Sequence, residues 1–168
     1  MDTLAHALWT NIAFIKTKAK TRWLGVLFGV LPDIISFGPI FLYTLLLGTR
    51  DWMQVSTIGF FSKYTSIVYG ITHSLIIFAI VYLILYLITK KHILFLFGWT
   101  IHILIDIPTH SKDFYPTPYL YPFNSYPIDG ISWAHPTFMI VNYGALVLVY
   151  GFLMYKYFRN HKKHHRKI

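Results

Sequence analysis

The sequence contains no cysteine and no glutamate, and only 12% of its residues are charged. The lack of cysteine excludes disulfide bonds and thiolate metal sites. Soluble domains carry about 25% charged residues, whereas this chain is 55% hydrophobic with a mean hydropathy of +0.51. The composition therefore predicts an integral membrane protein. With 168 residues, we expect one all-α bundle rather than two domains.

The acidic residues are all Asp, so any metal site must be built from His and Asp side chains. A polar or ionisable side chain inside a membrane is costly unless it has a partner, and such residues commonly mark a functional site. Four of the six Asp residues lie in or beside apolar runs: Asp2, Asp33, Asp106 and Asp129.

The strongest functional signal is the segment 98–110, GWTIHILIDIPTH. His102 and Asp106 are four residues apart, which puts both side chains on one face of a helix. Pro108 disfavours further helix, so we expect the chain to turn back there and place His110 over the helix end. An imidazole and a carboxylate that face the same way suit a divalent transition metal such as zinc. The alternative is a His–Asp hydrogen bond that joins two helices.

Apolar runs predict four spanning helices, preceded by a short N-terminal helix in residues 1–15 that packs into the bundle. The expected spans are 23–47, 67–89, 92–107 and 137–158, and the expected loops are 48–66 and 108–136. Asp2 is placed to cap the N-terminal helix. We interpret residues 1–158 as a single transmembrane domain, followed by the polybasic tail 159–168.

The first expected span contains small residues and prolines at informative positions. Gly25 and Gly29 have the spacing that allows close helix approach. Pro32 predicts a kink just before Asp33, and Gly38-Pro39 predicts a second break. A broken helix at membrane depth is tolerated where it lines a cavity.

The distribution of basic residues predicts the orientation. Cytoplasmic loops of membrane proteins carry an excess of Lys and Arg, and here the basic clusters are the turn 16–22, Lys90-Lys91 and the C-terminal tail. The two long loops contain only Arg50, Lys63 and Lys112. We therefore expect a multi-pass protein of the inner (cytoplasmic) cell membrane with a cytoplasmic C-terminus. The tail suits contact with membrane lipids, and we expect no nucleic-acid partner.

This topology places the ionisable groups at similar depths. Depth is counted from the cytoplasmic end of each segment at 1.5 Å per residue. His6, Asp33 and His102 then lie roughly 13 Å into the membrane, and Asp106 lies about one turn further. His73, counted from the outer side, lies roughly 21 Å from the inner side of a core about 30 Å thick. Unrelated polar residues would not be expected to share a depth. The convergence predicts that five ionisable groups share a single site: His6, Asp33, His73, His102 and Asp106.

The same residues occur in the motifs MDxxxH, LPD, GITHS and HxxxD. Their order and spacing resemble the YdjM family of membrane-bound metal-dependent hydrolases. The resemblance extends to Tyr121-Pro122-Phe123, which is similar to the family's short PF element. This chain departs from the family pattern where Val68-Tyr69 replaces a frequent His-Arg and Ile35 replaces a frequent Asp. The family is thought to be related to zinc phospholipases C and P1-type nucleases, so the resemblance implies cleavage of phosphoesters with these five residues as metal ligands.

The chemistry expected of such a site is hydrolysis with one or two zinc ions. A catalytic zinc keeps an open position for water and lowers the pKa of that water to about 7. Asp33 is the candidate bridging ligand or general base, and His110 the candidate general acid. Lys112 is the candidate contact for an anionic head group. We expect the substrate to be a lipid phosphate or another amphipathic phosphoester that enters from the outer side.

Other interpretations remain open from the sequence alone. A proton- or ion-coupled transporter also needs buried Asp and His and broken helices, and a non-catalytic membrane scaffold would keep the fold. His6 could be a packed histidine, Asp33 could satisfy backbone groups freed by Pro32, and His73 could join helices. The aromatic residues of 114–126 are most simply an interfacial belt. The oligomeric state does not follow from the sequence.

Overall fold

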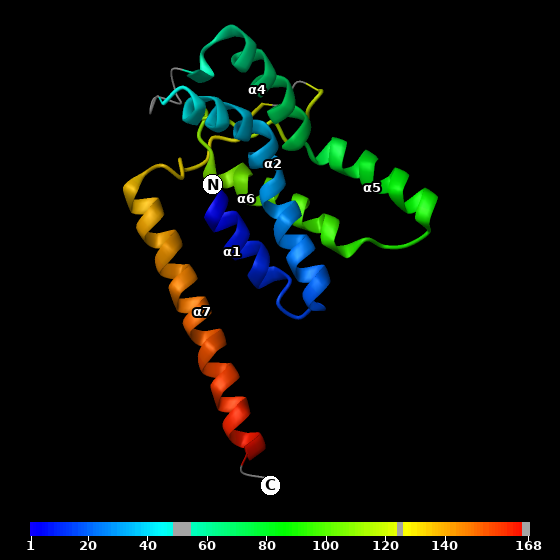
Figure 1. Ribbon diagram of the computed structural model, residues 1–168, viewed down its shortest axis with the longest axis vertical. Coiled ribbons are helices and arrows are strands. Elements are labelled where there is room, and N and C mark those ends of the chain that lie inside the picture. The colour runs from blue at the N-terminus through cyan, green and yellow to red at the C-terminus, as the bar shows by residue number, and fades with distance from the viewer. Residues whose placement is uncertain (49–54, 124–125, 166–168) are drawn as a thin grey trace. The chain divides into compact units, whose positions relative to one another are not determined.

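The computed structural model describes residues 1–48, 55–123 and 126–165, with side chains as far as residue 160. The described residues form helices and loops and contain no strand, which confirms the all-α expectation. They divide into two compact units, Met1–Ser132 and Trp133–Ile168. The first unit contains every candidate site residue, and the second contains one long helix (Figure 1).

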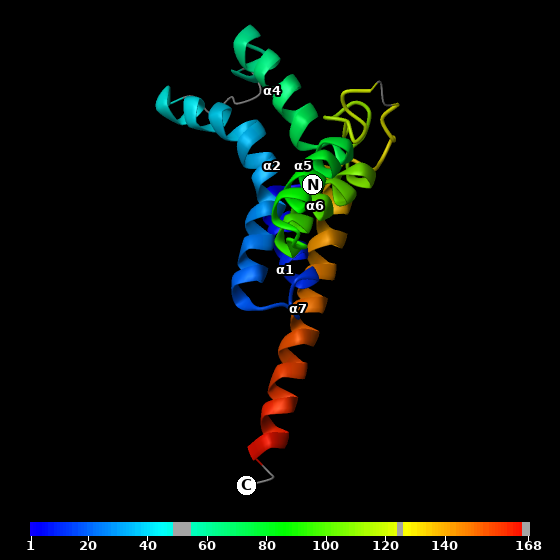
Figure 2. The same ribbon diagram turned by 90° about the vertical axis from the view of Figure 1, so that its right-hand side faces the viewer.

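The first unit is built around α2 (Ala19–Leu46). It packs against α1 (Thr3–Ala13), α4 (Gly59–Thr72), the short 3-10 helix η1 (Leu94–Leu96) and α6 (Phe97–Thr109). α5 (Leu75–Thr89) contacts α4 and α6. α2 changes direction along its length (Figure 2), and α1 lies beside its N-terminal part. Arg50, which we expected on the outer side, lies outside the described residues.

Two helices are long and apolar enough to cross a membrane: α2, and residues 136–160 of α7 (Pro136–His165). A third crossing is possible if α4 and α5 together form one broken span, since they meet at a bend of 58°. The predicted span 92–107 corresponds to η1 and α6, of which α6 has only 13 residues. That length is about 20 Å, short of the roughly 30 Å apolar core of a bilayer. The protein is thus a membrane protein, but four full spans are not confirmed.

The predicted loop 48–66 is wrong in its second half, because α4 begins at Gly59. Ser62, Thr65 and Ser66 are polar, but their spacing is helical and they share one face of α4. The predicted span 67–89 is also divided. α4 ends at Thr72, and Ser74 starts α5 as its N-cap, accepting bonds from the backbone of Ile76 and Ile77 at 3.2 Å each.

The expected break at Gly38-Pro39 is also wrong, because α2 continues through both of its prolines. Pro39 has no N–H, so the carbonyl of Ile35 loses its helical partner. The hydroxyl of Tyr64 on α4 donates to that carbonyl at 2.7 Å and replaces the missing bond. The helix is therefore kept intact by a neighbouring side chain, as membrane helices with proline commonly are.

The predicted close approach at Gly25 and Gly29 is confirmed. A Cβ at Gly98 of α6 would overlap the carbonyl oxygen of Gly25, and a Cβ at Gly29 would overlap the side chain of Thr10. The backbones of α2 and α6 thus meet with no room for a side chain, and the Thr10 side chain of α1 packs directly on Gly29. This contact brings the polar residues of the three helices to one place.

The second unit, Trp133–Ile168, contains a single long helix among its described residues. Its helix α7 extends the predicted span 137–158 by one residue at its start and by seven at its end. Residues 159–165 of the predicted tail continue α7, and residues 166–168 lie outside the described part of the chain.

Candidate metal centre

Four ionisable side chains of the first unit converge on one point. Asp33 comes from α2, His73 from the bend between α4 and α5, and His102 and Asp106 from α6. Each offers one ligand atom, and these atoms all lie within 4.8 Å of one another. The side chains of His73, His102 and Asp106 are fully buried, and that of Asp33 is 13% exposed.

His102 is oriented by a bond to the backbone of α2. Its Nδ1 lies 2.8 Å from the carbonyl oxygen of Gly29. A carbonyl can only accept, so Nδ1 carries the proton and Nε2 presents a lone pair. That Nε2 lies 3.1 Å from Oδ2 of Asp106, one turn later on α6. The predicted shared face of the two residues is therefore observed.

His73 has the same tautomer for a similar reason. Its Nδ1 lies 2.9 Å from the hydroxyl of Thr72 and 3.2 Å from the carbonyl of Tyr69. The Thr72 hydroxyl donates to the carbonyl of Val68 at 2.9 Å, so both neighbours of Nδ1 accept. Nε2 of His73 then presents a lone pair to Nε2 of His102, 3.0 Å away. Two lone pairs directed at each other repel unless a proton or a metal ion lies between them.

The carboxylates complete the group around this pair. Asp33 Oδ1 lies 3.8 Å from His73 Nε2 and 3.7 Å from His102 Nε2. Asp106 Oδ2 lies 3.5 Å from His73 Nε2. Tetrahedral zinc with ligand bonds of about 2.0–2.1 Å has ligands about 3.4 Å apart, and the observed separations lie on both sides of that value. Two imidazoles that donate through Nδ1 to fixed acceptors are also the usual arrangement of metal-binding histidines.

The second oxygen of Asp106 faces another set of nitrogen atoms. Oδ1 lies 2.8 Å from His6 Nε2 and 3.3 Å from His110 Nε2. The amino group of Met1 contacts the same oxygen and lies 2.8 Å from His110 Nε2. The His6 ring also stacks on His102, with 3.7 Å between ring centroids. Asp106 therefore joins the His73–His102 side of the cluster to a second side that contains His6 and His110.

The start of α1 is held in place by two carboxylates. Asp2 caps the helix as predicted, accepting from the backbone of Ala5 at 3.0 Å. The Thr3 hydroxyl donates to Oδ2 of Asp33 at 2.9 Å, which leaves Oδ1 of Asp33 facing the histidines. His6 lies one turn after Asp2 and is fully buried.

His110 lies just beyond the end of α6, as Pro108 predicted, although the helix continues one residue past that proline. The carbonyls at this end are satisfied by the returning chain: Gly130 donates to His110 at 2.9 Å and Ile131 to Pro108 at 3.0 Å. Nδ1 of His110 lies 2.6 Å from the carbonyl of Tyr115. Nε2 is therefore the ring nitrogen that faces Asp106.

The structure brings together four of the five predicted ligands in one group, and the fifth, His6, adjoins it through Asp106. Metal binding itself stays a prediction. Lys112 is not part of this cluster: its side chain is exposed, and its backbone N–H donates to Asp129 at 2.9 Å. Among the described residues, its ammonium forms no ion pair with Asp33 or Asp106.

Sequence reasoning missed the residues that orient the histidines. Thr72 and Tyr69 fix His73, Gly29 fixes His102, and Tyr115 fixes His110. Tyr69 lies four residues before His73, so helical spacing could have paired them. The carbonyls of Gly29 and Tyr115 carry no side-chain signal and could not have been found in the sequence.

Comparison with known proteins gives no assignment, because no family, curated protein or solved structure matches this chain.

Proposed function

We propose that the protein is a membrane-embedded, metal-dependent hydrolase that cleaves a phosphoester of a lipid or another amphipathic substrate. The observation that carries the proposal is the His73–His102 pair, whose Nε2 atoms face each other at 3.0 Å between two carboxylates. A buried group of two imidazoles and two carboxylates is a ligand set that zinc accepts.

The ligand set favours zinc over magnesium or calcium, which prefer oxygen ligands. When bound, such a metal activates water and polarises a phosphoryl oxygen. The amino group of Met1 contacts Oδ1 of Asp106 and lies 2.8 Å from His110 Nε2, which supports a single ion, held by the four-residue group. The bond from Nδ1 of His102 to Gly29 keeps that ring fixed whether or not a substrate is present.

Asp33 and His110 have the proposed catalytic roles. Asp33 is the one partly exposed member of the four-residue group, so water and substrate reach the centre on its side. Its carboxylate is the general base that takes a proton from the attacking water. His110 keeps its Nδ1 proton on Tyr115, so as an imidazolium it would give its Nε2 proton to the leaving oxygen and return to the neutral ring. Lys112, on the exposed loop after α6, attracts an anionic head group without contacting the centre.

The surroundings of Asp33 support a lipid substrate. A cavity of about 350 Å³ is lined by Pro32 and Ile35 of α2, Ile71 and Thr72 of α4, and Trp99 of α6, among others. Its walls are almost entirely apolar. Two of its lining residues, Pro32 and Thr72, directly precede Asp33 and His73 in the chain. An acyl chain in this cavity would bring the ester of a lipid to the metal centre.

Two further arguments support the proposal. The resemblance to the YdjM family, with its suggested relation to zinc phospholipases, favours phosphorus esters over carbon esters by analogy. The basic clusters favour an orientation with a cytoplasmic C-terminus. In that orientation, in the inner cell membrane, the loop after α6 lies on the outer side and substrate enters from there.

The bend at His73 favours ion-coupled transport as a second candidate function. Transporters commonly bind ions where a helix is interrupted near the membrane midplane, and here α4 and α5 meet at 58° beside the cluster. Ion flux into liposomes that contain the purified protein separates the two functions. A transporter would give flux that is lost in His73→Ala, and a hydrolase would give none.

The hydrolase proposal is tested by release of phosphate or head group from lipid phosphates by the purified protein in detergent. Activity should require a divalent metal and fall at least about 100-fold in both Asp33→Asn and His102→Ala. His92→Ala is the matched control, because His92 is exposed and bonds only to Tyr82 among the described residues. Release that survives a strong chelator and both substitutions would contradict the metal mechanism.

A further inference from the structure

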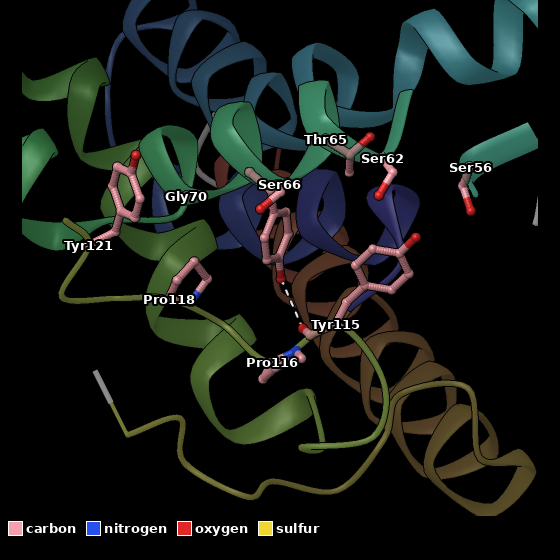
Figure 3. Close-up of a pocket in the computed structure, with 10 residues that line it drawn as sticks. Ser56, Ser62, Thr65, Ser66, Gly70, Tyr115, Pro116, Pro118 and Tyr121 are labelled. Carbon is pink, nitrogen blue, oxygen red and sulfur yellow. Dashed lines mark hydrogen bonds between the residues drawn. The ribbon is translucent and has the colours of Figure 1, made fainter. Parts of the chain in front are cut away.

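One face of α4 carries a row of hydroxyl groups that no step of the proposed reaction uses. Ser62, Thr65, Ser66, Tyr69 and Gly70 follow helical spacing and line a cavity of about 420 Å³ (Figure 3). On the adjacent face, Val68, Ile71 and Thr72 line the apolar cavity beside Asp33. α4 therefore separates two cavities of opposite character, and each is lined by a residue that contacts His73: Tyr69 in the first and Thr72 in the second.

The opposite wall of this hydroxyl pocket is formed by the loop that follows α6. Tyr115, Pro116, Pro118 and Tyr121 lie across from α4 (Figure 3). Tyr121 packs so closely on Gly70 that a Cβ there would lie 2.9 Å from its ring. The loop is also bonded to the start of α5, since Ser74 donates to the carbonyl of Tyr121 at 2.6 Å. The pocket is thus built from two segments held together by hydrogen bonds.

The chemistry of the hydroxyl pocket is uniform. Seven of its ten lining residues carry a hydroxyl, and none of those that the structure describes carries a charge. Ser62 and Ser66 are exposed on this face of α4, so their hydroxyls are available to a ligand with several hydroxyls of its own. A cationic ligand would find no carboxylate among the described lining residues.

Tyr69 connects the hydroxyl pocket to the metal centre. It lines the pocket, and its ring packs on that of His73 with 3.9 Å between centroids. Its hydroxyl donates to the carbonyl of Tyr115 at 3.1 Å, and that same carbonyl accepts from His110. A group bound in the pocket therefore lies one side chain away from the proposed ligand His73 and from the proposed acid His110.

We infer that the hydroxyl pocket binds an uncharged polyhydroxyl group, such as the glycerol or another polyol head group of a phospholipid, and so sets substrate choice. This inference rests on the proposed function. The phosphoester of such a lipid would lie at the metal centre, with the head group in the hydroxyl pocket and an acyl chain in the apolar cavity.

The test compares phosphatidylglycerol with phosphatidylethanol of the same acyl chains. The two lipids have the same charge, and only the first has head-group hydroxyls. Bound lipid is measured by native mass spectrometry of the protein released from nanodiscs that contain both lipids in equal amounts. We expect phosphatidylglycerol to be preferred about five- to tenfold, since each neutral hydrogen bond contributes about two- to tenfold in affinity.

Substitutions in the hydroxyl pocket test whether the preference for phosphatidylglycerol arises there. Ser66→Ala removes one exposed hydroxyl of the pocket, so the preference should fall about two- to tenfold, and adding Ser62→Ala should remove most of the remainder. Thr89→Val is the matched control, because Thr89 bonds only within the end of α5 and the turn after it. Equal binding of the two lipids, or a preference unchanged in the double variant, would overturn the inference.

Two further arms separate the possible outcomes. Free glycerol 3-phosphate, added as a competitor, should not displace phosphatidylglycerol if the acyl chain contributes to binding. Displacement at equal concentration would overturn the lipid as the source of the polyol. Head-group release is measured in parallel. If the protein binds phosphatidylglycerol selectively but releases no head group, only the proposed function is contradicted. If release requires His102 but is equally fast for both lipids, only this inference is contradicted.

Discussion

Nε2 of His73 and Nε2 of His102 lie 3.0 Å apart, and the Nδ1 atom of each ring is directed at an oxygen acceptor of the surrounding helices. His73 lies at the bend between α4 and α5 and His102 in α6, and both rings are fully buried. Each ring therefore turns its unprotonated nitrogen toward the other. This arrangement is unfavourable for two neutral histidines alone and favourable around a cation. The orientation of the two rings is therefore the main argument for a metal centre.

Removal of the metal should destabilise the first unit. Without a cation, the two lone pairs and the carboxylates of Asp33 and Asp106 repel each other in a buried site. A ligand that binds only the folded state at 100 times its Kd stabilises that state by about 2.7 kcal/mol. We expect a chelator to lower the thermal midpoint in detergent, and zinc to restore it while magnesium does not. An identical midpoint with and without the chelator would contradict this.

Gly98→Ala should strongly destabilise the contact between α6 and α2. The new Cβ would overlap the backbone carbonyl of Gly25, which cannot move without displacing α2. We expect a loss of about 3 kcal/mol or more in the free energy of unfolding, together with loss of bound metal. The measurement is denaturation in detergent followed by helical circular dichroism.

Gly144→Ala is the control for that substitution. Gly144 lies in α7, and a Cβ there has no neighbour within 4 Å. Replacing a helical glycine by alanine at an open position should stabilise the helix by about 0.5–1 kcal/mol. If both glycine substitutions had the same effect, the close approach of α6 to α2 would be wrong.

Tyr64→Phe tests how α2 tolerates Pro39. The substitution removes the hydroxyl that donates to the carbonyl of Ile35, and leaves that carbonyl without its replacement partner. We expect a loss of about 1–2 kcal/mol in the free energy of unfolding. Tyr126→Phe is the matched control, because Tyr126 is 89% exposed, and its substitution should have no measurable effect. Equal stabilities of the two variants would rule out the proposed role of Tyr64.

Part of the site could be predicted from the sequence because it depends on local spacing, whereas the depth count used for His73 started from a span that the structure divides. His102 and Asp106 share a helix face through their four-residue separation. His6, Asp33 and His73 were assigned to the site by counting residues from the ends of the apolar runs. The glycine pair at 25 and 29 indicated a close contact, which the structure shows with Gly98 and Thr10.

The errors came from judging segments by composition. Residues 59–66 contain enough polar side chains to suggest a loop, but their hydroxyls lie on one helix face that lines a cavity. The prolines of α2 suggested breaks, but a partner for the carbonyl of Ile35 came from another helix. Ring orientation at His73 and His102 could not be predicted, because it depends in part on backbone carbonyls brought close by tertiary packing.

The most direct test of the metal centre is the metal content of the purified protein. Elemental analysis of protein prepared in zinc-supplemented medium should find about one zinc or more per chain. His73→Ala and His102→Ala should each lose most of it, and His92→Ala should retain it. A natural protein without bound metal, or His73→Ala and His102→Ala variants that both keep the full amount, would contradict the account.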